Sequence, residues 1–175
     1  MSSEKTSTFT FRIDKEYEKV LREEAQTKKI TVNALANQIF GDYVEWQRYM
    51  EKFGTIVLSR EAFKIVLDSL DEKSLLNLAV DIGGKAPKEF ILFKWKEIAI
   101  DNVIKFVKMY FDHCGYGTHD HTKTGGMITF SIRHDLGKKG SLFLKTFLET
   151  LIKSTLGKSC NSTVTTNSLV LSFQD

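Results

Sequence analysis

A strict alternation of apolar and polar residues marks the start of the chain. Over residues 8–14 it places Phe9, Phe11 and Ile13 on one face of a predicted strand. The opposite face carries Thr8, Thr10 and Arg12. A strand this short needs a partner, and the residues that follow have a helical pattern, so we expect it to pair with the same strand of a second copy. The pattern therefore predicts a homodimer.

Two amphipathic helices are predicted next. Asp14 is the expected N-cap of the first helix, in which apolar residues recur at helical spacing over 17–25. Thr31 is the expected N-cap of the second helix, whose apolar stripe covers residues 35–44. This second helix is expected to continue until Gly54 stops it.

The order of strand, helix, turn and helix over residues 8–46 resembles the ribbon-helix-helix family of transcriptional regulators (Arc and methionine repressor type). The resemblance implies that two strands pair across a dimer and enter the DNA major groove. It implies base contacts by the outward strand residues Thr8, Thr10 and Arg12, since arginine suits guanine and threonine can donate or accept. It also implies a DNA phosphate at the start of the second helix, where unpaired N–H groups favour an anion. The matching residues are Lys28, Lys29, Thr31, Val32 and Asn33.

The pattern beyond residue 54 predicts a second, α+β part of the chain. Its expected helices begin at Ser59, at Asp71, near Pro87 and at Asp101, and a final one covers residues 138–155. The expected strands cover residues 55–58, a hairpin of 116–121 and 127–134, and residues 162–165 and 169–173. This arrangement resembles ferredoxin-like sensor domains. We therefore expect a DNA-binding module over residues 1–53 and a dimerisation or sensor domain over 54–175.

Composition narrows the class of protein. With 42% hydrophobic and 27% charged residues the chain is typical of a soluble globular protein. The 25 basic and 22 acidic residues give a net charge of +3, which is too small by itself to indicate nucleic-acid binding. Any argument for nucleic-acid binding must therefore come from where the basic residues lie in the chain. Charged residues interrupt the richest apolar stretch, 90–107, so no membrane span is expected. Two cysteines and a polar start predict a reduced, cytoplasmic protein.

The histidines are the candidate metal ligands. His119 and His121 are two residues apart, so on a strand they point to the same side and can bind one ion through imidazole nitrogens. If the turn places His121 opposite Met127, then His134 lies opposite Cys114. That pair is about 20 Å from His121 along the hairpin. One subunit then cannot gather all these groups, whereas a site shared across a dimer interface, or two separate half-sites, could. The pattern favours the simpler interpretation that His119 and His121 flank a solvated turn. No cofactor is predicted, and a metal ion is kept as an alternative.

Catalysis has little support in the sequence. Cys114 and His134 suggest a thiolate–imidazolium couple, but Cys114 falls on the apolar side of its helix, where a buried structural thiol is expected. No nucleophile triad or phosphate-binding glycine motif is present. We therefore do not expect an enzyme.

The function expected from these patterns is that of a cytoplasmic, homodimeric, sequence-specific DNA-binding regulator, with pairing of dimers into tetramers left open. One alternative is a dimeric ligand- or protein-binding module of the antitoxin type without direct DNA readout. The other is a metal-responsive regulator, since nickel-responsive repressors combine a ribbon-helix-helix arm with a ferredoxin-like domain and a His-x-His strand.

Overall fold

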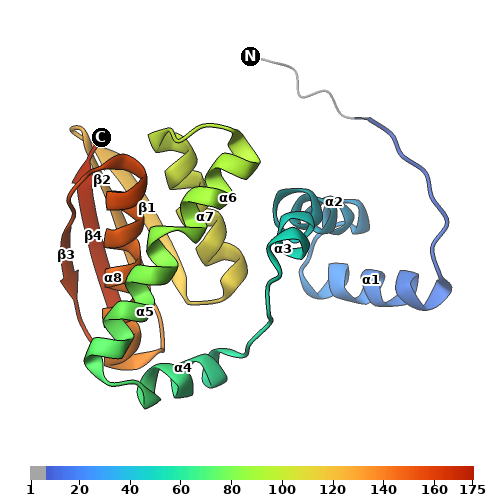
Figure 1. The fold of residues 1–175 in the computed structure, drawn as a ribbon. Coiled ribbons are helices and arrows are strands. Elements are labelled where there is room, and N and C mark those ends of the chain that lie inside the picture. Colours follow the sequence, from blue (N-terminus) through green and yellow to red (C-terminus); the bar gives the residue numbers. More distant parts are fainter. Residues whose placement is uncertain (1–6) are drawn as a thin grey trace. The chain divides into compact units, whose positions relative to one another are not determined.

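The chain divides into two compact units in the computed structural model, which describes residues 7–175. Unit 1 is Met1–Gly54 and unit 2 is Thr55–Asp175. Figure 1 shows the ribbon of each unit.

Unit 1 is helical from Lys15 onward. Its elements are α1 (Lys15–Thr27), α2 (Val32–Asp42), a π-helical segment η1 (Tyr43–Gln47) and α3 (Arg48–Phe53). The side chain of Asp14 accepts a hydrogen bond from the N–H of Glu16, and that of Thr31 accepts one from Ala34, so both predicted N-caps are confirmed. The second helix continues through η1 and α3 to Gly54, which adopts a left-handed conformation with φ of 66°.

The predicted strand over residues 8–14 is wrong, and with it the ribbon-helix-helix assignment of the fold. Residues 7–14 are an extended arm without strand pairing, and α1 is the first regular element. A strand exists only where a second strand accepts its hydrogen bonds, and no residue of the described range 7–175 supplies one to the arm. Instead, the ring of Phe11 packs edge-on against that of Phe40 on α2, with 5.9 Å between centroids.

Unit 2 contains α4 (Arg60–Ser69), α5 (Glu72–Gly84), α6 (Ala86–Trp95), α7 (Ile100–Cys114) and α8 (Gly137–Leu156). Ser59 and Asp71 cap α4 and α5 through hydrogen bonds from Ala62 and Ser74, as their positions predicted. Gly115 and Gly157 end α7 and α8 in left-handed conformations. Among residues 7–175, no helix combines the length and the apolar character needed to cross a lipid bilayer.

The sheet of unit 2 consists of β1 (Thr118–Thr124), β2 (Met127–Arg133), β3 (Asn161–Val164) and β4 (Ser168–Gln174). All neighbours are antiparallel, in the order β1-β2-β4-β3. The ferredoxin-like expectation is wrong, because that fold alternates as βαββαβ, whereas here α8 alone connects two hairpins. The sequence pattern located these four strands but did not indicate their connections or their order in the sheet.

The core of unit 2 lies between the sheet and its helices. Alternate residues of β2 and β4 are buried on one face, where α7 and α8 cover the sheet (Figure 1). These strand residues are Ile128, Phe130, Ile132, Leu169, Leu171 and Phe173. Helix α4 is anchored to this body at both ends, because Arg60 pairs with Asp135 at 3.0 Å and the Lys139 ammonium donates to the carbonyl of Asp68 at 2.7 Å.

The segment between α3 and α4 differs from its prediction. A short strand was expected over residues 55–58, yet these residues are extended without strand pairing. High strand propensity alone does not make a strand when no neighbouring strand lies alongside.

The packing of α5 against α8 depends on a close approach at Gly83. A methyl group at this position would lie 2.6 Å from the carbonyl oxygen of Phe147, whereas one at Gly84 would meet only a methyl of Thr150 at 3.8 Å. We expect Gly83→Ala to cost about 1–3 kcal/mol of unfolding free energy through overpacking. Gly84→Ala is the control and should be neutral or mildly stabilising. Thermal unfolding followed by circular dichroism checks this, and equal melting temperatures for the two variants would contradict it.

Candidate functional site

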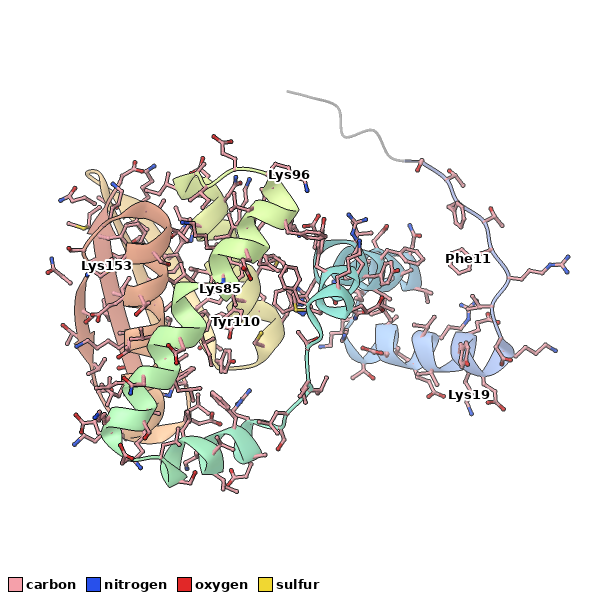
Figure 2. The ribbon with its side chains drawn as sticks, viewed as in Figure 1. Phe11, Lys19, Lys85, Lys96, Tyr110 and Lys153 are labelled. Carbon is pink, nitrogen blue, oxygen red and sulfur yellow. The ribbon has the colours of Figure 1, made fainter. Side chains whose placement is uncertain are left out.

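The arm of residues 7–14 is attached to unit 1 by its aromatic side chains. Phe11 contacts Phe40, and Phe9 lies 6.1 Å from Phe11 between ring centroids. Figure 2 shows Phe11 pointing from the arm toward the helices of unit 1. The three predicted base-contacting residues of the arm are exposed, and these are Thr8, Thr10 and Arg12. A partner can therefore reach these side chains, although the segment that carries them is not a strand.

The turn between α1 and α2 has a lysine where a glycine is usual. The N–H of Ile30 donates to the carbonyl of Ala25, and that of Lys29 to Gln26, which is the hydrogen-bond pattern of a Schellman motif. Lys29 occupies the left-handed position of this motif with φ of 55°. A side chain at that position costs roughly 1–2 kcal/mol relative to a right-handed one. Lys29 is exposed, so its ammonium group projects into solvent beside the start of α2.

The start of α2 leaves backbone donors available. The first helical hydrogen bond runs from Leu35 to the carbonyl of Thr31, and the Thr31 side chain already caps Ala34. The N–H groups of Val32 and Asn33 precede that first bond and point out of the helix end. The predicted phosphate-binding residues thus form one continuous stretch of the chain. Within residues 7–175, no hydrogen bond or ion pair joins this stretch to Thr8, Thr10 or Arg12, so the two predicted sets remain separate.

Neighbouring glutamates neutralise most cations of α1 and its C-cap. Arg22 pairs with Glu18 at 2.7 Å, and Lys28 pairs with Glu24 at 2.6 Å. Lys19 pairs more loosely with Glu23, and Figure 2 shows its side chain pointing away from the arm. Within residues 7–54, by contrast, four cations have no ion-pair partner, and these are Arg12, Lys15, Lys29 and Arg48. The positive charge of unit 1 that is free for an anion therefore lies on the arm, on the turn, at the start of α1 and at Arg48.

Unit 1 leaves most of its large apolar side chains in solvent. Ala25 and Leu35 are the buried apolar residues among residues 7–54, while Phe9 is 81% exposed, Tyr17 68% and Phe40 49%. We define the apolar surface of unit 1 as Phe9, Phe11, Ile13, Tyr17, Val20, Ile39, Phe40, Tyr43 and Val44. The sequence pattern indicated these residues as a core, and a single chain does not bury them.

The histidines of β1 contact neighbouring protein side chains in the described part of the chain. His119 and His121 face the same side of the sheet, but His121 lies opposite Phe130, not Met127, because the hairpin turn contains only two residues. The Nε2 atom of His119 lies 2.8 Å from a carboxylate oxygen of Asp112, and His121 stacks on Phe130. No group of three metal-binding side chains occurs among residues 7–175. Each histidine therefore already contacts a protein side chain, Asp112 for His119 and Phe130 for His121.

The cysteines are in environments that suppress thiolate chemistry. Burial raises the pKa of the Cys114 thiol to about 12 and that of Cys160 to about 11. The hydroxyls of Tyr110 and Tyr116 are hydrogen-bonded to each other at 3.1 Å, and burial raises the pKa of both phenols. Because the pKa values of both thiols lie well above 7, both thiols are protonated at neutral pH. This disfavours the thiolate–imidazolium couple of Cys114 and His134 that the sequence suggested.

His134 has a structural role that the sequence did not indicate. Its Nδ1 atom accepts the N–H of Leu136 at 3.2 Å, so the neutral ring carries its proton on Nε2. Nε2 then donates to the Ser141 hydroxyl at 2.9 Å, which in turn donates to the carbonyl of Thr166 at 3.1 Å. The backbone N–H of His134 donates to the carbonyl of Asn167. This network joins the end of β2, the start of α8 and the β3–β4 loop.

Comparison with known proteins adds no assignment. Neither the models of protein families nor the curated proteins contain a match to this chain.

The network predicts a pH dependence of stability. Burial lowers the pKa of His134 below its ordinary value of 6.5, and the nearby Asp135 opposes this only in part. As the pH falls, the unfolded chain therefore takes up the proton before the folded chain does. The contribution of neutral His134 to the free energy of unfolding is complete above pH 6.5 and is lost as the pH falls toward the lowered pKa. The loss is at most about 1.4 kcal/mol per pH unit. We expect the imidazole resonance of His134 to titrate below pH 6.5 in an NMR titration. A midpoint at or above 6.5 would show that the neutral network is wrong.

Proposed function

We propose that this chain is a homodimeric DNA-binding regulator that contacts DNA through unit 1. The turn between α1 and α2 carries the proposal. There, Lys29 has no ion-pair partner within residues 7–54 and stands next to a helix end whose Val32 and Asn33 N–H groups precede the first helical hydrogen bond. Unpaired N–H groups, the helix dipole and an adjacent ammonium all favour a phosphate. Phosphate contacts of this kind position a protein on DNA.

The arm supplies the base contacts in this proposal. Arg12 is exposed and has no ion-pair partner within residues 7–54, and Thr8 and Thr10 flank it along the extended chain. An arginine can bind guanine bidentately, and extended N-terminal arms of DNA-binding proteins enter a groove without forming a strand. Base readout by this arm therefore does not depend on the strand pairing that the fold lacks.

The homodimer rests on the apolar surface of unit 1. An aromatic side chain buries roughly 150–250 Å² when it is fully covered. The aromatic side chains of the apolar surface are half to four-fifths exposed. Together with the aliphatic side chains of this surface, they leave on the order of 800 Å² of apolar area open to solvent. A stable protein interface buries about 800 Å² per partner. A second copy is present wherever the chain is made, and it carries the same surface. We therefore assign this surface to self-association.

One observation favours a second candidate function, a protein-binding module of the antitoxin type. The ion pairs of Arg22 and Lys28 with neighbouring glutamates remove charge that a DNA-binding helix would present. A protein partner would cover the apolar surface without needing that charge. The two functions differ in their response to salt, since only phosphate binding releases counterions.

Removing the charge of Lys29 tests the phosphate contact without harming the fold. Glycine is favoured at a left-handed position, so Lys29→Gly should leave the melting temperature equal or higher. We expect this variant to bind a fluorescein-labelled random-sequence duplex of about 30 base pairs more weakly. Its salt dependence, plotted as log K against log salt concentration, should be less steep by about one unit. Fluorescence anisotropy over a salt series measures both.

The matched control is Lys153→Ala, which removes an exposed lysine from α8 in unit 2 and should change neither quantity. Arg12→Ala should weaken binding to a sequence selected from a random pool by about 1–3 kcal/mol and relax the base preference. If the unmodified protein binds duplex DNA no better than bovine albumin at low salt, the DNA-binding function is refuted and the protein-binding function is favoured.

A charge placed in the apolar surface should dissociate the dimer. We expect Phe40→Glu and Tyr17→Glu to shift the protein from dimer to monomer in sedimentation equilibrium, because each would bury an unpaired carboxylate. Tyr17→Glu puts a negative charge in the first turn of α1, where the helix dipole favours it, so this variant retains its helix. Ile65→Glu, at an exposed site on α4, is the control. An unchanged mass for both unit 1 variants would place the dimer interface elsewhere.

A further inference from the structure

The segment that joins α3 to α4 exposes three consecutive aliphatic side chains. Ile56 is 90% exposed, Val57 98% and Leu58 53%, and the backbone there is extended. Within residues 7–175 the backbone groups of Ile56, Val57 and Leu58 have no hydrogen-bond partner. No charged residue occurs from Gly54 to Ser59.

These features are those of a strand that lacks its neighbour. Isoleucine and valine favour extended structure, and an extended apolar segment with free backbone groups readily pairs with another chain. Natural proteins that keep such a segment unpaired usually place lysine or proline in it. This segment contains neither.

We propose that the segment pairs with the same segment of a second copy, as a two-stranded antiparallel ribbon centred on Val57. The inference rests on the homodimer of the proposed function, because the segment continues directly from Gly54, the last residue of the unit that carries the apolar surface. Antiparallel pairing about a twofold axis sets Val57 opposite Val57 and Ile56 opposite Leu58. Every apolar side chain then meets another apolar side chain.

The ribbon would connect the dimer of unit 1 firmly to unit 2. Immediately after the segment, Arg60 donates to the carbonyl of Gly115 at 2.8 Å and pairs with Asp135 at 3.0 Å. The end of the segment is therefore fixed to the body of unit 2. Pairing would replace two independent tethers with one shared connection between the two copies.

Hydrogen exchange and cross-linking test the ribbon in the full-length protein. At concentrations where sedimentation shows a dimer, we expect the amides of residues 56–58 to exchange at least about tenfold more slowly than in an unstructured peptide. Residues opposite each other in an antiparallel pair have Cα atoms about 4.5–5.5 Å apart, which suits a disulfide. The Val57→Cys variant should therefore form a disulfide-linked dimer in oxidised glutathione. A Ser69→Cys variant at the end of α4 is the control and should not.

The outcomes separate this inference from the proposed function. A dimer that lacks both amide protection and the Val57→Cys cross-link overturns the ribbon and leaves the homodimer of unit 1 intact. Protection without that cross-link means that the segment pairs with a different edge, such as β1, and also overturns self-pairing. A chain that is monomeric at every concentration refutes the proposed homodimer itself.

Discussion

Burial of apolar surface is divided unequally between the two units, and the properties of unit 1 follow from this. Helices as short as α1 and α2 are marginal in water unless an apolar face is covered. Within residues 7–54 only Ala25 and Leu35 provide buried apolar side chains, so tertiary packing in one chain contributes little. In the proposed homodimer, the second copy that covers the apolar surface would thus contribute to the folding free energy of unit 1. For this reason, association and any DNA contact of unit 1 are expected to be coupled.

Unit 2 is independent of that constraint. Its sheet, α7 and α8 enclose a continuous core, and α4 is fixed at both ends by Arg60 and Lys139. Its buried polar groups are mostly satisfied internally, as in the network of His134, Ser141 and the carbonyl of Thr166. A unit of this kind keeps its shape whether or not unit 1 is paired. It can therefore serve as a rigid body to which the proposed dimer of unit 1 is attached.

The candidate site was predictable wherever it depends on local contacts. The cap at Thr31 and the position of Lys29 in the turn involve hydrogen bonds that span only a few residues. The surroundings of the histidines were not predictable, because the contact of His119 with Asp112 joins β1 to α7 across a loop. A turn two residues long instead of five also shifted the partner of His121 from Met127 to Phe130. Register depends on turn geometry, which apolar alternation does not specify.

The sequence by itself determined where several of the helices begin or end. Asp14, Thr31, Ser59 and Asp71 cap the helices that follow them, and Gly54, Gly115 and Gly157 stop others, because these effects act within one turn of the chain. Tertiary structure decided which extended segments become strands. Residues 8–14 and 55–58 have the pattern of strands but find no partner strand within residues 7–175, whereas β1 to β4 form a sheet. The reason is physical: a helix satisfies its backbone hydrogen bonds within itself, but a strand needs a neighbour that its own residues do not specify.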